Sequence, residues 1–285
     1  MRPRGVAAVA ALVAVAAVWG LTFVMIKQAI TDLPALEFLA LRFFFAAALL
    51  AVAFPKLSIP SHGSLRPGIL AGLALAAGYG FQTFGLKFIG ATESGFITGM
   101  MVVFTPVIGG LVARTWPRPI AIAAVIMSSI GLILLFTQGR PLVGGIGLGE
   151  VLTLGCAMSF AIHVVVLAKN SPNHDARTLA IIQMSTCAVV FTALALLGQE
   201  WKLPTSQVVV ALVVTSVGAS ALGFLVMTWA TQVLTETQTA VTLTLEPVFA
   251  GIAGVILLEE HLSPVGWLGA ILIFAAMLAA NARSQ

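Results

Sequence analysis

Charged side chains are scarce in this chain. Only 8% of its 285 residues are Asp, Glu, Lys or Arg, and 60% are hydrophobic; an ordinary soluble domain is roughly 25% charged. Apolar runs of the length that crosses a bilayer, roughly 20 residues, follow one another with short polar or Pro/Gly links. No stretch remains for a separate soluble domain. The composition therefore predicts an integral membrane protein in contact with the lipid bilayer.

Cysteine is rarer still, and the sequence lacks the common motifs of metal, nucleic-acid and nucleotide binding. Cys156 and Cys187 are the only cysteines and have no CxxC or His spacing, so neither a disulfide framework nor a metal site is expected. The basic residues are scattered and form no patch, which argues against a nucleic-acid partner. The GGIGLG stretch at 144–149 lacks the Lys-Ser/Thr of a phosphate loop. We therefore expect no nucleotide and no other cofactor.

The apolar runs predict an all-α fold. They are longer than transmembrane barrel strands and lack their alternation. The first run, 5–26, also exceeds the core of a cleaved signal peptide, so we interpret it as an uncleaved helix. Ten transmembrane helices are predicted, at about 5–30, 34–54, 66–88, 92–114, 118–137, 148–168, 177–197, 206–229, 237–258 and 264–281.

Basic residues divide unequally between the two sides of these helices. When consecutive links alternate sides, one side receives Arg2, Arg4, Lys56, Arg66, Arg114, Arg118, Lys169, Arg177 and Arg283. The other side receives Lys27, Lys87, Arg140 and Lys202. Because cytoplasmic links are enriched in Lys and Arg, both termini are predicted to be cytoplasmic. The expected location is the inner (plasma) membrane, which the chain crosses many times.

The two halves of the sequence look duplicated. Pro106 in FTPVIGG and Pro247 in LEPVFAG lie 141 residues apart, and Trp19 falls on Phe160 at the same shift. We predict repeats at 1–141 and 142–285. Five helices per repeat is an odd number, so the second copy is inverted, an architecture typical of secondary transporters that work by alternating access. Pro106 and Pro247 are candidate hinges.

Two charged residues fall inside predicted helices. Arg42 and Glu246 lie near the middle third of the bilayer at 1.5 Å per residue, where charge is costly. They can present opposite charges to a zwitterionic substrate, or Glu246 can carry a proton. The alternatives are a structural ion pair, or Glu246 capping backbone that Pro247 leaves free. His163 can relay protons or simply bond to a neighbouring helix.

Deep aromatic and polar residues complete the candidate site. Trp19 and Tyr79, with Phe81, Gln82, Phe84, Phe160 and Trp229, can line a cavity suited to an apolar or aromatic side chain. Hydroxyls near the two prolines can satisfy freed carbonyls or touch substrate. The candidate substrate-binding residues are Glu246, Arg42, His163, Trp19, Tyr79, Gln82, Phe160, Thr98 and Thr242. No catalytic residue and no metal ligand is predicted.

Several short motifs occur in order along the chain. They are VWGLTF (18–23), LRF (41–43), TPV (105–107), LEPVF (245–249) and LEEHLSP (258–264). In these motifs the chain resembles the EamA-type family of the drug/metabolite transporter superfamily. The resemblance implies a transporter and not an enzyme, and it includes branches that export amino acids, among them aromatic ones. The first repeat departs from the pattern, with RTWPRP (114–119) in place of an acidic link.

The function predicted is export of small metabolites, most plausibly amino acids with aromatic or apolar side chains, through a central cavity. An importer or facilitative exchanger of another metabolite stays open, as does proton coupling. A channel or a membrane-embedded enzyme would be a different class. An enzyme is disfavoured because Glu246 and His163 are the only central acid/base pair, with no nucleophile beside them. We expect a monomer.

Overall fold

The computed structural model describes the chain except residues 1–2, 58–61, 140–146, 199–201, 258–262 and 283–285. Arg2, Arg140, Arg283 and most of the LEEHLSP motif therefore lie outside the described residues. All regular structure in the described part is helical. The prediction of an all-α protein is confirmed.

The helices of the first half follow the predicted apolar runs. They are α1 (Pro3–Asp32), α2 (Ala35–Ala53), α3 (His62–Gly85), α4 (Ala91–Gly99), α5 (Met101–Ala113) and α6 (Pro119–Thr137). A short 3-10 turn, η1 (Pro55–Leu57), follows α2. The predicted helix 92–114 is thus two helices, α4 and α5, which are separated at Met100.

The second half begins with α7 (Leu148–Asn170), the 3-10 turn η2 (Ser171–Asn173) and α8 (Ala176–Leu197). The predicted helix 206–229 contains α9 (Ser206–Val213), a π-helix η3 (Val214–Leu222) and α10 (Gly223–Ala230). The predicted helix 237–258 is broken at Thr244 into α11 (Glu236–Leu243) and α12 (Leu245–Leu257), and α13 (Pro264–Ala282) follows.

Seven continuous spans in the described part of the chain are long and apolar enough to cross a membrane. They are Arg4–Asp32, Ala35–Ala53, Ala91–Ala113, Pro119–Thr137, Leu148–Asn173, Ala176–Leu197 and Ser206–Ala230. A shorter apolar helix, Pro264–Ala280, lies near the C-terminus. The chain is a multi-pass membrane protein.

Prolines accompany both breaks. Pro106 lies inside α5 and Pro247 lies inside α12. Because proline has no N–H, neither can donate the α-helical bond to the carbonyl four residues earlier. The nearby hydroxyls bond within their own helices: Thr105 Oγ1 donates to Met101 O at 2.7 Å, and Thr244 Oγ1 donates to Val241 O at 2.6 Å. These bonds reach Met101 O and Val241 O, and not the Val102 and Leu243 carbonyls that the two prolines leave without a helical bond.

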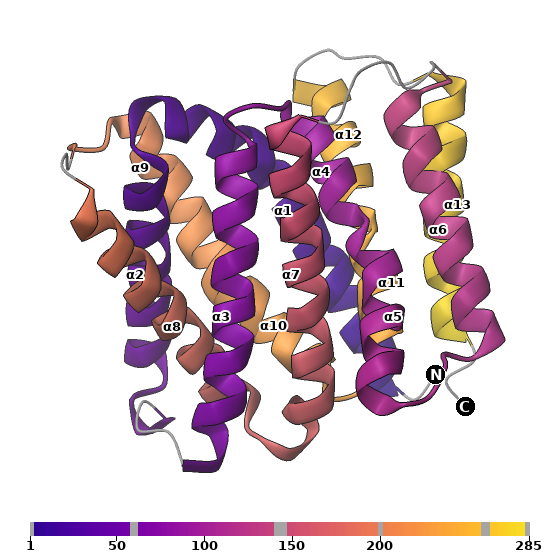
Figure 1. The fold of residues 1–285 in the computed structure, drawn as a ribbon, viewed down its shortest axis with the longest axis horizontal. Coiled ribbons are helices and arrows are strands. Elements are labelled where there is room, and N and C mark those ends of the chain that lie inside the picture. Colours follow the sequence, from indigo (N-terminus) through magenta and orange to yellow (C-terminus); the bar gives the residue numbers. More distant parts are fainter. Residues whose placement is uncertain (1–2, 58–61, 140–146, 199–201, 258–262, 283–285) are drawn as a thin grey trace.

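The helices form one bundle in which the two halves interlock (Figure 1). α3 packs along α7 and α8, α2 packs along α8, and α6 pairs with α13 at one side of the bundle. α1 begins and α13 ends at the same end of the bundle, which we call the termini end. The helix boundaries bring Lys56, Arg114, Lys169 and Arg177 to this end.

Two glycines let α6 and α13 touch through their backbones. A Cβ at Gly131 would lie 2.8 Å from Gly269 O, and a Cβ at Gly269 would lie 2.6 Å from Gly131 O. Small residues at such crossings let transmembrane helices approach closely. Backbone atoms cannot move aside as a flexible side chain can. This pair therefore requires glycine on both helices.

Gly269→Ala is expected to lower the stability of the folded protein by about 1–3 kcal/mol, the usual cost of overpacking. The measurement is the thermal unfolding temperature of the purified protein in detergent. Gly90→Ala is the matched control, because nothing lies within 4 Å of a Cβ at Gly90. Equal melting temperatures for the two variants would contradict the close approach of α6 and α13.

Candidate substrate cavity

A narrow cavity of about 20 Å³ lies in the middle of the bundle. It is lined by residues of α1, α3, α5, α7, α10, α11 and α12. These residues are Trp19, Thr22, Phe23, Ile26, Tyr79, Gln82, Met101, Phe160, His163, Val164, Phe224, Met227, Leu243 and Glu246. Both halves of the chain therefore build one site, and Glu246 is the acid among these residues.

Aromatic rings form the wall of the cavity. The Tyr79 ring packs edge to face on Phe160, with centroids 5.2 Å apart, and on Phe224 at 5.9 Å. The Trp19 and Phe224 rings lie 5.0 Å apart. A side chain at Gly78 would clash with the Phe160 ring, so this glycine lets α7 lie close to α3. The rings are fixed by one another and by close helix packing.

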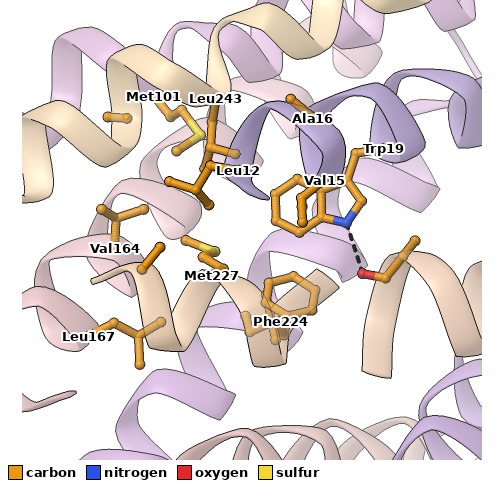
Figure 2. Packing of buried hydrophobic residues seen from close by; sticks show 14 of the residues in the cluster. Leu12, Val15, Ala16, Trp19, Met101, Val164, Leu167, Phe224, Met227 and Leu243 are labelled. Carbon is orange, nitrogen blue, oxygen red and sulfur yellow. Dashed lines mark hydrogen bonds between the residues drawn. The ribbon is translucent and has the colours of Figure 1, made fainter. Parts of the chain in front are cut away.

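The π-helix η3 holds Trp19 in place. The N–H of Gly223 bonds to Gly218 O, five residues back, instead of the Ala219 carbonyl that an α-helix would use. Trp19 Nε1 donates to Ala219 O at 2.8 Å (Figure 2). The wider turn thus leaves a carbonyl for the indole, which ties α1 to the second half of the chain.

Glu246 lies in the first turn of α12, just after the helix break, and its side chain is 9% exposed. A Cβ at Gly20 would lie 2.6 Å from Glu246 O, so the α1 backbone packs directly against this turn. Within the described part of the chain, no hydrogen bond or ion pair involves the Glu246 carboxylate, and it faces the cavity. The ion pair with Arg42, one of the alternatives considered, is absent there.

Arg42 belongs to the protein interior behind the cavity wall. Its side chain is 1% exposed, its Nε donates to Ser220 Oγ at 2.8 Å, and its guanidinium carbon lies 4.3 Å from the centre of the Tyr79 ring. Arg42 is not among the described residues that line the cavity. It stacks on a ring that does line it, and it connects α2 to η3.

His163 lines the cavity and is held by a polar network. Its Nε2 lies 2.7 Å from Gln183 Oε1. The amide group of Gln183 donates to Leu179 O and to Thr228 Oγ1, which fixes its oxygen toward the histidine. His163 Nε2 must then be the donor, and Nδ1 of the neutral ring is an acceptor. This geometry matches the expected bond to a neighbouring helix.

Of the nine candidate binding residues, six line the cavity: Glu246, His163, Trp19, Tyr79, Gln82 and Phe160. Thr98 lies one layer behind, where it accepts from Gln82 Nε2 at 3.3 Å and contacts Cys156 Sγ at 3.8 Å. Thr242 donates to Gln238 O at 2.8 Å within α11. Arg42 and these two threonines support the wall without lining it.

Three aromatic residues expected in the wall lie elsewhere. Tyr79 and Gln82 are three residues apart and share a face of α3, whereas Phe81 and Phe84 point away, and Phe81 is 40% exposed. Trp229 is also absent from the lining. Phe224 and Met227, three residues apart on α10, take its place, because the π-helix shifts the helical face before them.

A larger polar vestibule lies at the end of the bundle opposite the termini. It is lined by the last turns of α1, the first turn of α4 and neighbouring residues, among them Lys27, Gln28, Asp32 and Glu93. Lys27 Nζ donates to Ile89 O. Phe23 lines both the vestibule and the central cavity. Phe23 therefore lies between the vestibule and the central cavity.

Apolar side chains close the cavity toward the termini end. Leu12 lies two turns before Trp19 on α1, and Leu167 lies one turn after His163 on α7; neither is more than 1% exposed. Figure 2 shows Leu12, Met227 and Leu243 converging on one another beside Met101 and Val164. The structure therefore holds the cavity shut at one end.

An interior cavity between two interlocked halves of a multi-pass bundle is typical of membrane transport proteins. The model of the EamA-like transporter family matches residues 6–137 and again residues 147–282. The chain belongs to this family. The expectation of a transporter and not an enzyme is confirmed.

Relatives agree with this assignment. An uncharacterized transporter of Archaeoglobus fulgidus is 29% identical over 272 residues, which cover 95% of this chain and 85% of the relative. The uncharacterized transporter YoaV of Bacillus subtilis is 26% identical, and 92% of each chain is covered. A protein crystal structure matches with a TM-score of 0.78 over 96% of this chain and 97% of its own. At 16% identity it shows the fold alone.

Ser220→Ala is expected to destabilise the protein by about 1.5–3 kcal/mol, because it leaves the buried Arg42 Nε without its acceptor. A double-mutant cycle with Arg42→Met, read by thermal unfolding, isolates the pair. The double variant should lose less than the sum of the two single variants. Strictly additive losses would mean that the Arg42–Ser220 bond does not join α2 to η3.

Proposed function

We propose that the protein is a secondary transporter that exports small metabolites, namely amino acids with aromatic or apolar side chains, by alternating access through the central cavity. The observation that carries this proposal is the Glu246 carboxylate. It lies in a cavity with aromatic walls and has no bonding partner among the described residues. An intramembrane charge of this kind is costly unless it meets a substrate or a proton.

Two inverted five-helix repeats, and with them ten transmembrane helices, are the architecture proposed for this transport. Three observations support it. The family model matches the chain twice. A helix in each half is broken near an internal proline, Pro106 or Pro247. The packing is also reciprocal, since α1 lies against α11 and α12, and α7 lies against α4 and α5. Both prolines remain candidate hinges.

Alternating access is supported by the contrast between the two ends of the cavity. The polar vestibule adjoins it at one end, and buried apolar side chains fill the other. Such a contrast suits a state open away from the termini end. Rocking one repeat against the other would separate the apolar side chains and close the vestibule. In export, substrate would enter the cavity from the termini side of the membrane and be released through the vestibule.

Purified protein in proteoliposomes preloaded with unlabelled phenylalanine should take up external labelled phenylalanine transiently, by saturable counterflow. Glu246→Gln should slow this flux at least about tenfold, because a bond to a charged group is lost. Glu150→Gln is the matched control, since the Glu150 carboxylate caps α7 through the Gly147 N–H, outside the cavity. Unlabelled amino acids competing in the assay define the substrate.

The same vesicles separate the alternatives. Flux that never saturates would identify a channel and contradict the carrier. If Glu246 or His163 carries protons, flux follows an imposed pH gradient and Glu246→Gln or His163→Ala abolishes that dependence. Flux indifferent to the gradient would instead identify a facilitative exchanger. If cells take up the labelled substrate through this protein but do not release it, the protein is an importer and not an exporter.

We further propose that the protein is a monomer in the inner membrane with both termini in the cytoplasm. Gln28 in the vestibule and Lys56 at the termini end are both exposed, whereas Cys156 and Cys187 are fully buried. In intact cells a membrane-impermeant maleimide should label Gln28→Cys and spare Lys56→Cys until the cells are permeabilised. The reverse pattern would invert the orientation, because the basic residues would then lie outside.

A further inference from the structure

We infer that the cavity recognises the ammonium group of its substrate, and that it binds primary amines with an aromatic or apolar body whether or not they also carry a carboxylate. This inference rests on the proposed transport function and specifies which part of the substrate Glu246 binds. It arises from the juxtaposition of one acid, hydrogen-bond acceptors and five aromatic residues in one cavity.

The charges on the cavity wall favour a cation. Among the described residues that line the cavity there is Glu246 but no Lys or Arg. Arg42 stacks on the Tyr79 ring and donates to Ser220, outside the lining set. Arg42 Nη1 is a buried donor without a hydrogen-bond partner, but it lies outside the lining, so a substrate carboxylate would meet no charged partner on the cavity wall, which is costly. A substrate ammonium would meet the Glu246 carboxylate.

The polar atoms around Glu246 are also suited to an ammonium group, which has three donors and no acceptor. His163 Nε2 is committed to Gln183, so Nδ1 of the neutral ring is an acceptor. The Leu243 carbonyl receives no helical bond from Pro247, which has no N–H. Glu246, His163 and Leu243 all line the cavity. Glu246 and the His163 ring therefore offer acceptors on the cavity lining, where a charged group would bind.

Aromatic faces add to this preference. Trp19, Tyr79, Phe160 and Phe224 line the same cavity as Glu246. The negative face of an aromatic ring attracts a cation, and more strongly when water is excluded. The same rings accept the apolar body of the ligand. The cavity thus offers a carboxylate for the amine and rings for the remainder of the molecule.

Three ligands that differ only in their charged groups test the inference: 2-phenylethylamine, phenylalanine and 3-phenylpropionate. Their dissociation constants are measured by calorimetry on the full-length protein in detergent. The amine should bind at least as tightly as phenylalanine, and the acid should not bind. Glu246→Gln should weaken amine binding at least about tenfold, Glu246→Asp should weaken it less, and Glu150→Gln should leave it unchanged.

Several results would overturn the inference. The first is that 3-phenylpropionate binds and that Arg42→Met abolishes its binding. The second is that phenylalanine binds and 2-phenylethylamine does not, and the third is that none of the three ligands binds. The fourth is that Glu246→Gln leaves binding of 2-phenylethylamine unchanged. If the Glu246→Gln variant does not fold, two measurements still test the inference. They are the order of the three affinities on the unaltered protein and the affinity of the Glu246→Asp variant for 2-phenylethylamine.

The counterflow assay keeps the two hypotheses separate. Saturable phenylalanine counterflow that 2-phenylethylamine does not inhibit would refute ammonium recognition and leave the transporter standing. Amine binding dependent on Glu246, with no saturable flux of either phenylalanine or the amine, would refute transport and leave the binding site standing.

Discussion

The placement of one carboxylate inside an apolar bundle is the constraint around which this structure is built. An acid in the centre of a membrane helix costs roughly 2.5–3.5 kcal/mol on insertion scales. Glu246 is accommodated at the break between α11 and α12, in the first turn of α12, where the helix dipole favours negative charge. The break, the glycine at position 20 and the aromatic wall all lie around this carboxylate.

Three other interior polar residues around the cavity differ from Glu246 because each has a hydrogen-bond partner within the protein. Arg42 is bonded to Ser220, His163 to Gln183, and Trp19 to Ala219. Each of these bonds joins one helix to another and holds the cavity wall in place. Glu246 alone among these groups has no such bond in the described part of the chain. Residues that look alike in the sequence thus differ in whether the protein itself supplies their partner.

Much of the fold could be predicted because lipid imposes simple rules. Apolar runs gave the helices, and the pair Pro106 and Pro247 indicated where two of them would be irregular. Six of the residues that line the cavity were also predicted. The depth of a residue in the bilayer follows from its position along the helix, at a rise of 1.5 Å per residue. Rotation about the helix axis does not follow from depth, so the sequence left Arg42 open between substrate contact and a structural role; its guanidinium stacks on Tyr79, outside the cavity lining. The π-helix has no sequence signal, and it moves Phe224 and Met227 into the wall.

Alternating access requires that one cavity be exposed in turn to the two ends of the bundle. The most direct test is the reactivity of Leu12→Cys and Gln28→Cys with a small water-soluble thiol reagent, with and without a transported substrate. Leu12 is fully buried at the closed end and Gln28 is exposed in the vestibule. Substrate should raise the reactivity of Leu12→Cys and lower that of Gln28→Cys. Changes in the same direction, or a Leu12→Cys that never reacts, would contradict alternating access.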